Sequence, residues 1–536
     1  VVSSLGKGLS ASAIATLLQA RGYKVKLRKL DPYLNVDPGT MNPNQHGEVF
    51  VTDDGAETDL DLGHYERFTG VPASRFDNIT AGKVYQQVIL NERKGKYLGK
   101  TVQVIPHVTD QIKLNIKEGI DNIDFLIIEV GGTVGDIESL PFLEAIRQIR
   151  NEIGNKKSLF IHLTLIPYLA AADELKTKPT QHSVKELREI GIQPDILICR
   201  SEKKISIEDK NKIALFCNIN VDKIIQAIDV KSIYELPKHF QKEGLDKQIL
   251  NLLSLSTLKK ADLTKWEKIV FKQKNLTAKV NIGIIGKYTK LKDAYKSLTE
   301  ALHHSGINKN VQVIIDWVDA SEKNFNIKKL KNLDGILVPG GFGKRGIEGK
   351  IRAITYARKN FIPFFGICFG MQLAVIEVAR NLLNIKNASS SEFTSKKSVN
   401  IIGLLKEWDK KGIKVKRNAS SEMGGTMRLG SYLCHLTKDS LAKKIYKKAI
   451  IKERHRHRYE MNIKYENKLS KKGLVISGKS PDGKLPEIIE IKKHPWFIGV
   501  QFHPELISRP LKPHPLFNSF INASIEYKEK KNEKTK

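Results

Sequence analysis

The sequence predicts an α/β protein built from two doubly wound, Rossmann-like domains. Short β-branched runs alternate with amphipathic helical patterns over residues 1–255, as in 124–130 (DFLIIEV) and 194–200 (PDILICR). Such alternation is typical of parallel sheets with crossover helices. A second alternating series starts at 279–288 (KVNIGIIGKY), after a polar, lysine-rich stretch. A chain of 536 residues is also too long to form a single core.

These patterns divide the chain into four parts. We expect an N-terminal domain over 1–255, a connecting segment over 256–278, a C-terminal domain over 279–525 and a disordered, charged tail over 526–536. The expected strands lie at 23–30, 124–130, 159–166 and 194–200 in the first domain, and at 279–288, 311–317, 334–338, 362–367 and 497–502 in the second.

Composition excludes several classes of protein. With 40% hydrophobic and 28% charged residues, and no apolar run of about 18 residues, we expect no membrane association. The net charge of +32 invites a nucleic-acid hypothesis, but the lysines do not alternate with aromatic residues. We therefore expect solvated basic faces that also attract anionic nucleotides, and no nucleic-acid partner. Four scattered cysteines fit neither a disulfide scaffold nor a zinc site and favour the reducing cytoplasm.

The pentapeptide GICFG places Cys368 between an apolar run and a helical pattern. Gly366 and Gly370 flank the cysteine at the two positions where a tight strand-to-helix turn requires small residues. The positive end of the following helix would lower the pKa of the thiol. The pentapeptide alone leaves open whether Cys368 is a nucleophile or an ordinary buried core cysteine.

A candidate base lies 135 residues downstream, where an apolar strand ends in His503-Pro504-Glu505. The proline stops the strand, and the two-residue spacing lets Glu505 orient the His503 ring. His503 can then accept the thiol proton, which is the base-plus-orienter arrangement that activates a nucleophile.

A glycine-rich loop follows the strand in DGILVPGGFGKRG (334–346). Exposed backbone in such a loop can direct N–H groups at a developing oxyanion. We expect Gly341, together with the N–H of Phe369, to form this oxyanion hole.

The blocks PGGFG, GICFGMQ and FHPE resemble the class I glutamine amidotransferase family in order and approximate spacing. The resemblance implies hydrolysis of the glutamine side-chain amide through a thioester on Cys368. It also implies that the basic stretch ERHRHRYE holds the carboxylate of glutamine. Phe369 stands where that family more often has leucine, with little consequence because its contact is made by backbone. The substrate contacts that the family implies are Gly370, Met371, Gln372, Glu392 and Arg458.

The N-terminal stretch SLGKG precedes an amphipathic helix and resembles the end of a phosphate-binding loop. Lys7 would supply a positive charge for phosphates. The usual loop motif ends in Gly-Lys-Ser/Thr, whereas this stretch ends in Gly-Lys-Gly. Glycines that merely turn the chain are the equally weighted alternative.

Six acidic residues lie between positions 53 and 66. In a chain of net charge +32 such a cluster is costly unless it meets a cation, and Mg²⁺ prefers hard oxygen ligands. Glu129 ends a buried strand, at the edge where α/β sheets bind ligands, and is a candidate second metal ligand. A solvated acidic loop is the alternative interpretation.

The segment 174–191 (ELKTKPTQHSVKELREIG) offers lysines, a threonine and a glutamine beside a proline. These side chains suit a triphosphate and a base edge, and an ordinary basic loop would have the same composition.

The chain closely resembles the CTP synthase family in three long blocks. These blocks begin at KLDPY (29–33), EVGGTVGDIESLP (129–141) and KTKPTQHSVKEL (176–187). The resemblance covers residues 1 to about 525. It implies that ATP phosphorylates the 4-oxygen of UTP and that ammonia from the second domain then displaces phosphate to give CTP. It further implies Mg²⁺ at Asp61 and Glu129, activation by GTP, feedback inhibition by CTP and a homotetramer.

The family places its nucleotide sites at specific positions of this sequence. The nucleotide loop is Ser3, Ser4, Leu5, Gly6, Lys7, Gly8 and Leu9, with Lys29 near the reacting phosphates. The UTP site is Asp136, Ile137, Glu138, Lys176, Thr177, Lys178, Pro179, Thr180, Gln181 and Lys212, and the adenine lies near Ile228, Asp229 and Val230. Because the family has a strand and two further glycines before Val1, and the chain does not begin with Met, we expect an N-terminal piece to be missing.

Two alternatives stay open. Another glutamine-dependent, ATP-driven amidoligase would share the two-domain logic with a different acceptor site. A structural, filament-forming or nucleic-acid-binding protein that has lost catalysis would not need the intact set Cys368, His503 and Glu505.

Overall fold

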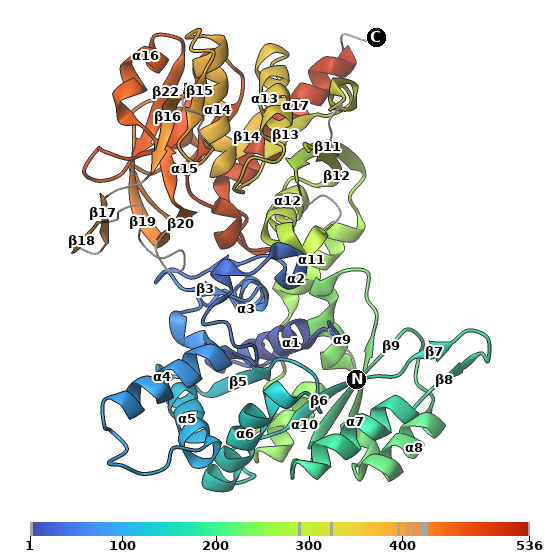
Figure 1. Ribbon diagram of the computed structural model, residues 1–536. Coiled ribbons are helices and arrows are strands. Elements are labelled where there is room, and N and C mark those ends of the chain that lie inside the picture. Colours follow the sequence, from blue (N-terminus) through green and yellow to red (C-terminus); the bar gives the residue numbers. More distant parts are fainter. Residues whose placement is uncertain are drawn as a thin grey trace. The chain divides into compact units, whose positions relative to one another are not determined.

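The computed structural model describes residues 4–287, 291–321, 325–393, 397–404, 407–410, 413–416 and 427–533. Its chain forms two compact units (Figure 1). One unit comprises Val1–Pro38 with Asp61–Phe271, and the other comprises Gly39–Leu60 with Lys272–Lys536. The mixed α/β character of both units agrees with the predicted fold class. The segment 39–60 differs from the predicted division, which placed it in the first domain.

The first unit contains two three-stranded parallel sheets, with strand orders β4-β1-β5 and β10-β9-β6. Their strands are β1 (Val25–Asp31), β4 (Asn78–Thr80), β5 (Phe125–Val130), β6 (Ile161–Leu165), β9 (Ile196–Ser201) and β10 (Ile224–Ile228). The unit's helices are α1 (Lys7–Ala20), α3 (Asp61–Thr69), α4 (Ala81–Arg93), α5 (Thr109–Lys117), α6 (Leu140–Ile153), α7 (Lys178–Glu189), α8 (Ile207–Cys217), α9 (Leu236–Lys242) and α10 (Leu245–Leu252). A short hairpin, β7 (Tyr168–Leu169) with β8 (Glu174–Leu175), precedes α7.

A cavity of about 890 Å³ borders both β5 and β6. Apolar side chains dominate its lining, including Leu126 and Ile128 of β5 and Leu163 of β6, and Lys7 also reaches it. Among the described residues no backbone ladder joins β5 to β6, so the predicted sheet of this unit is divided into two.

The second unit is built on a nine-stranded sheet with the order β12-β11-β13-β14-β24-β23-β22-β19-β20. The first five strands in this order are parallel, and the remaining four continue antiparallel. The strands are β11 (Ala278–Gly286), β12 (Val311–Asp319), β13 (Gly335–Val338), β14 (Phe364–Ile367), β19 (Arg428–Leu436), β20 (Ile450–His457), β22 (Leu474–Lys479), β23 (Pro486–Ile491) and β24 (Phe497–Val500).

Helices cover both faces of this sheet, as expected for a doubly wound domain. One buried cluster includes Ile351 of α13 (Ile347–Lys359) and Val375 of α14 (Phe369–Asn381). The other includes Leu302 of α12 (Lys296–Asn308) and Phe517 of α17 (Pro515–Glu533). The smaller elements of the unit are α2 (Pro43–His46), β2 (Phe50–Val51), β3 (Glu57–Thr58), β15 (Ala388–Ser390), β16 (Val399–Leu404), β17 (Glu407–Lys410), β18 (Ile413–Lys416), α15 (Leu441–Tyr446), β21 (Tyr459–Met461) and α16 (Glu466–Ser470).

Two segments are more ordered than their composition indicates. The predicted connector contains helix α11 (Thr264–Lys274), whose Trp266 is 6% exposed and stacks on Phe68 with ring centroids 5.3 Å apart. Helix α17 extends to Glu533, so the prediction of disorder is wrong for residues 526–533. Lys528 of this helix donates a hydrogen bond to the Lys279 carbonyl at 2.7 Å, while 534–536 lie outside the described residues.

Membrane spans are not found in the described ranges, where every helix is too short or too polar to cross a bilayer.

Candidate active site

Cys368 lies on a sharp turn between β14 and α14. Its backbone has φ 51° and ψ −100°, a strained combination for a non-glycine residue. The flanking glycines make the turn possible, since a Cβ at Gly370 would lie 2.0 Å from the Val338 carbonyl oxygen and one at Gly366 would lie 2.9 Å from the Gly370 backbone. The Cys368 N–H donates to the Val500 carbonyl of β24 at 2.7 Å, which fixes the turn against the neighbouring parallel strand.

His503 follows the same neighbouring strand, so the thiol and the imidazole leave the sheet at one edge. His503 Nδ1 lies 2.7 Å from Glu505 Oε1, the orienting contact expected from the His-Pro-Glu spacing. A Cβ at Gly340 would lie 2.8 Å from His503 Cε1 and 3.7 Å from Cys368 Cβ, which places both side chains around one glycine.

The charge state of His503 follows from these neighbours. Burial lowers its pKa, but the charges of Glu505 and Cys368 outweigh burial and raise the pKa to about 10. His503 Nε2 is buried without a partner of good hydrogen-bond geometry among the described residues. It is still close enough to Cys368 Sγ for the charge on the sulfur to raise the pKa of His503.

The glycine-rich loop lies beside Cys368 and Phe369. A Cβ at Gly341 would lie 3.9 Å from the Phe369 ring and 3.8 Å from Lys350 Nζ. Lys350 is 1% exposed, and its ammonium lies 5.1 Å from the centroid of the Phe369 ring. Burial, reinforced by the charge of Lys287, lowers the pKa of Lys350 to about 7. Sequence reasoning missed Lys350, although it falls on the apolar stripe of the helical pattern at 347–359.

Two buried glutamines connect the thiol to its surroundings. Gln501 Nε2 lies 3.7 Å from Cys368 Sγ. Gln372 Nε2 donates to the Tyr459 carbonyl at 2.7 Å and to Gln501 Oε1 at 3.2 Å, so this amide is engaged within the protein. Gln501 was not predicted; its signal in the sequence is a polar residue at the end of an apolar strand, two positions before His503.

The basic stretch ERHRHRYE divides its side chains between two faces of β20. Arg454 and Arg456 form ion pairs with Asp53 and Glu57, at 2.7 and 2.8 Å. The prediction that this whole stretch holds a carboxylate is therefore wrong for these two arginines. Arg458 follows the strand, and its charge acts on Glu392, whose Oε1 also accepts a hydrogen bond from Gly343 N at 2.6 Å.

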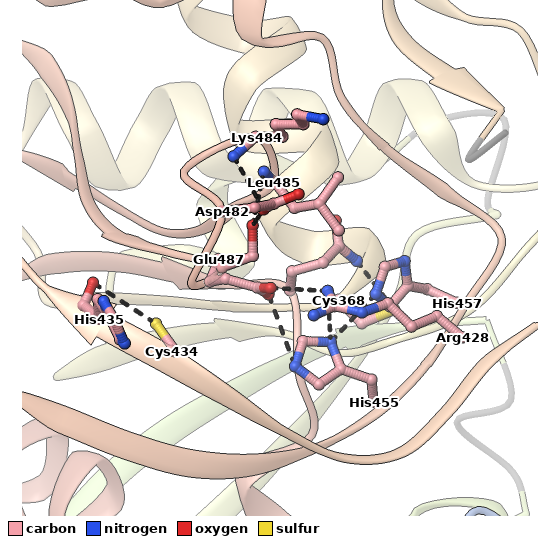
Figure 2. Close-up of polar contacts among 12 residues, drawn as sticks. Cys368, Arg428, Cys434, His435, His455, His457, Asp482, Lys484, Leu485 and Glu487 are labelled. Carbon is pink, nitrogen blue, oxygen red and sulfur yellow. Dashed lines mark hydrogen bonds and ion pairs between the residues drawn. The ribbon is translucent and has the colours of Figure 1, made fainter. Parts of the chain in front are cut away.

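The opposite face of β20 carries two buried histidines (Figure 2). His457 Nδ1 lies 3.1 Å from the Tyr459 carbonyl and must donate to it, so its Nε2 accepts from His455 Nδ1 at 3.1 Å. Burial holds the pKa of both rings well below the ordinary value, and both are neutral. Arg428 Nη1 lies 2.7 Å from Glu487 Oε1, and Figure 2 shows this pair beside His455. These described side chains therefore contact one another and support the strand.

The first unit contains a separate charged cluster. Lys29 and Glu129 are register partners on β1 and β5. Lys29 Nζ lies 2.8 Å from Glu129 Oε1 and 2.6 Å from Asp61 Oδ2. The Tyr65 hydroxyl donates to Glu129 Oε2. Burial raises the pKa of Glu129 to about 7 against the opposing charge of Lys29.

Two carboxylates that converge on one ammonium fit a divalent cation by the chemistry of their oxygen atoms. Asp61 is also packed against the predicted phosphate loop, since a Cβ at Gly8 would lie 2.2 Å from Asp61 Oδ1. No group of three or more His, Cys, Asp or Glu side chains suited to a metal occurs within the described ranges. Asp61 and Glu129 are the side chains of this cluster that could hold such a cation.

Only part of the acidic stretch 53–66 belongs to that cluster. Asp53 and Glu57 meet arginines, as described, and Asp59 lies 3.3 Å from His46. The Ala73 N–H donates to Glu66. Asp53, Glu57 and Asp59 thus meet basic side chains of the protein, while Asp61, the residue of this stretch expected to hold Mg²⁺, contacts Lys29.

The predicted nucleotide residues lie on loops and helix ends of the first unit. Lys7 is the first residue of α1, and its Nζ donates to the Gly132 carbonyl. Arg200, which sequence reasoning missed, donates to the Leu5 carbonyl at 3.1 Å and pairs with Asp229 at 2.8 Å. It thereby connects the phosphate loop to the region predicted for adenine. Ser3 lies outside the described residues.

The residues predicted for UTP are partly engaged by the protein itself. Asp136 accepts from Thr133 N at 2.7 Å, while Ile137 is 80% exposed. Thr180 Oγ1 lies 2.9 Å from Thr164 Oγ1, and Gln181 Nε2 donates to Thr177 Oγ1 at 3.1 Å. Lys178 and Pro179 begin α7, with Lys178 Nζ 5.6 Å from the centre of the Phe216 ring. Lys176 pairs with Glu174, and Lys212 lies exposed on α8.

Two features of the structure are those expected of a glutamine-hydrolysing ligase. One is the thiol at a strained turn beside a carboxylate-oriented histidine, and the other is the Lys-Asp-Glu cluster beside a glycine loop. The family description "CTP synthase N-terminus" matches residues 1–255, and "Glutamine amidotransferase class-I" matches 290–523. The chain belongs to the CTP synthase family, the glutamine-hydrolysing ligases that convert UTP to CTP.

The similarity extends along the full chain. It is 63% identical over 530 residues to the CTP synthase of Pelagibacter ubique, covering 98% of both chains. It is 58% identical over 528 residues to the CTP synthase of Rhodospirillum centenum, covering 98% of this chain and 97% of that one. A solved structure, the Trypanosoma brucei CTPS glutaminase domain with bound acivicin, is 38% identical and covers 46% of this chain and 94% of that one, with a TM-score of 0.42.

The raised pKa of His503 predicts a specific pH dependence. Its value of about 10 lies above the ordinary 6.5, so protonation of His503 stabilises the fold fully below about pH 6.5, and this contribution is lost as the pH rises toward 10. Glutamine hydrolysis should fall on the same alkaline limb, as expected of an imidazolium that protonates the leaving ammonia. Glu505→Gln removes the largest favourable charge and should move the limb to lower pH. A limb that stays in place in a pH–rate profile of this variant would contradict the assignment.

Proposed function

We propose that this chain forms CTP from UTP, ATP and glutamine through two reactions carried out in its two units. The observation that carries this proposal is the strained Cys368 turn beside the His503–Glu505 pair. Ammonia released there would be used by the unit that contains Lys29, Asp61 and Glu129.

The first reaction is hydrolysis of the glutamine amide. His503 already holds the proton taken from the thiol, and the Cys368 thiolate attacks the amide carbon to form a tetrahedral intermediate. The backbone N–H groups of Phe369 and Gly341 stabilise the oxyanion. His503 then returns the proton to the departing nitrogen, which leaves as ammonia, and water hydrolyses the glutamyl thioester to glutamate.

The substrate site is assigned from the residues around this pair. Arg458 and Glu392, whose charges act on each other, suit the carboxylate and ammonium groups of glutamine. Gly370 and Met371 lie at the start of α14, directly behind the nucleophile. Gln372 acts through Gln501 in this arrangement, since its amide is already hydrogen-bonded to protein.

The second reaction activates the 4-oxygen of UTP, because an amide-like oxygen is a poor leaving group until it is phosphorylated. Lys7 and Lys29 provide positive charge for the transferring phosphoryl group, and Asp61 and Glu129 would hold Mg²⁺. When bound, Mg²⁺ would neutralise negative charge on the phosphates. Ammonia then attacks C4, and the C–O bond to the phosphorylated oxygen breaks with release of phosphate.

The remaining assignments rest on family membership. UTP occupies the region of Asp136–Glu138, Lys176–Gln181 and Lys212, and the adenine of ATP lies near residues 228–230. GTP activates glutamine hydrolysis, CTP inhibits as product, and the active form is a homotetramer. The four unpaired cysteines fit a reducing cytoplasm.

The proposal is tested by incubating the protein with UTP, ATP, Mg²⁺ and glutamine and following CTP by absorbance. We expect CTP to appear and glutamate to accumulate in equal amount. Replacement of UTP by other acceptors of amidoligases should give no aminated product. Amination of a different acceptor, with no CTP formed, would instead identify another glutamine-dependent amidoligase.

A further inference from the structure

The segment Gly39–Leu60 belongs to the same compact unit as Lys272–Lys536, although in sequence it lies within the match to the CTP synthase N-terminus at 1–255. It contains the antiparallel pair β2–β3, with Phe50 opposite Thr58 and Val51 opposite Glu57. The glutamine-hydrolysing unit therefore includes a piece of chain that its own family match, at 290–523, does not contain.

Backbone and side-chain hydrogen bonds join this segment to strand β19. Ser431 N donates to the Asp53 carbonyl at 2.9 Å, and Ser431 Oγ donates to Asp53 Oδ1 at 3.0 Å. Gly55 and Gly430 both have positive φ, and a Cβ at Gly430 would lie 2.7 Å from Gly55 N. So close a backbone approach needs glycine at both positions.

Two arginines of β20 hold the segment by ion pairs. Arg454, 1% exposed in its side chain, contacts Asp53 at 2.7 Å and donates to the Val51 carbonyl at 3.1 Å. Arg456 contacts Glu57, 2% exposed, at 2.8 Å and donates to the Gly39 carbonyl at 3.3 Å. Each pair is partly buried. Loss of a carboxylate therefore leaves an arginine charge that β20 would shift to solvate.

The backbone of the same two arginines contacts the catalytic pair. The Arg454 carbonyl accepts a hydrogen bond from His503 N at 2.8 Å. The Arg456 carbonyl accepts a hydrogen bond from Cys368 Sγ, with the two atoms 3.8 Å apart. The side chain of each arginine thus contacts the 39–60 segment, while the carbonyl of the same arginine contacts one member of the catalytic pair.

We propose that Asp53 and Glu57 are positioning residues for glutamine hydrolysis, which act through β20 to set the geometry of Cys368 and His503. This inference rests on the proposed glutaminase function of that pair. A displacement of about 1 Å between nucleophile and base is sufficient to lower turnover about 100-fold.

The test compares Glu57→Gln and Asp53→Asn with a control variant of the same unit, Glu466→Gln. The control removes the Glu466–Lys479 ion pair, whose atoms lie 2.8 Å apart and whose side chains are both about 30% exposed. For Glu57→Gln we expect the kcat of glutamine hydrolysis to fall about tenfold or more, with the KM for glutamine changed by less than about twofold. CTP formation from free ammonia should stay within about twofold of the unmodified enzyme. Asp53→Asn should give a loss at least as large, since the arginine charge that it leaves, on Arg454, is 1% exposed.

Rescue separates positioning from general stability. The paired exchange Glu57→Arg with Arg456→Glu restores the ion pair and should recover most of the lost kcat. The inference is overturned if Glu57→Gln and Asp53→Asn hydrolyse glutamine like the Glu466→Gln control. It is also overturned if glutamine- and ammonia-driven synthesis fall in parallel, or if the exchange recovers stability but not kcat. Absence of glutaminase in the unmodified enzyme would instead defeat the proposed function.

Discussion

Cys368→Ala will abolish CTP formation from glutamine and leave CTP formation from free ammonia within about twofold of the unmodified enzyme. Alanine removes the only atom that can form the glutamyl thioester, so glutamate release should fall about 10⁴-fold or more, as for loss of other catalytic nucleophiles. The turn itself should persist, because its geometry depends on Gly366, Gly370 and the Val500 carbonyl and not on the sulfur. Glutamate release and CTP absorbance in parallel assays provide the measurement.

Cys434→Ala is the matched control for this experiment. Cys434 is fully buried in the same unit, and burial, reinforced by the neighbouring carboxylates Glu487 and Glu453, holds its pKa far above the ordinary thiol value. It should therefore retain both activities. Equal loss of glutamine- and ammonia-driven synthesis in Cys368→Ala would show that the cysteine supports the fold and is not the nucleophile.

Glu129→Gln should affect the two activities in the opposite way to Cys368→Ala: CTP formation is lost and glutamate release is kept. The carboxamide keeps the shape of the side chain. Its one oxygen can still accept from Lys29, and its NH2 group can donate to the Tyr65 hydroxyl oxygen, so the first unit should fold. It removes one of the two negative charges that would hold Mg²⁺ beside the phosphates. We expect CTP formation to fall about 100-fold or more with either nitrogen donor, while glutamate release from glutamine continues.

Glu152→Gln is the control for charge removal in the same unit. Glu152 is 41% exposed in its side chain and pairs with Lys113 and Lys117 at 2.8 and 3.0 Å. Its loss should leave both activities unchanged, as expected for a surface ion pair. Retention of full ammonia-driven synthesis in Glu129→Gln would remove this carboxylate from the phosphoryl-transfer site.

The geometry of the Cys368 turn and of the His503–Glu505 contact could be predicted because it depends on local sequence. GICFG specifies a turn that only small flanking residues permit, and His-Pro-Glu sets the distance between an imidazole and its carboxylate over two residues. The oxyanion loop is a prediction of the same reasoning. The structure adds that Gly340 contacts His503 and Cys368, whereas Gly341 lies beside Phe369.

Contacts between distant residues could not be predicted in this way. The sequence shows that six acidic side chains lie between 53 and 66, but not that Asp53 and Glu57 meet arginines about 400 positions away. Burial of Lys350 and the helical continuation of the charged tail depend likewise on tertiary packing, which overrides composition. The expected strands of the first domain were correct in type, but their division into two sheets was not predicted.

The most direct test of the division of labour is to measure glutamate release and ammonia-driven CTP formation side by side in Cys368→Ala and Glu129→Gln. Our assignment predicts that the cysteine variant forms CTP without releasing glutamate, and that the glutamate variant releases glutamate without forming CTP. Two variants that lose the same activity, or that each lose both, would contradict it.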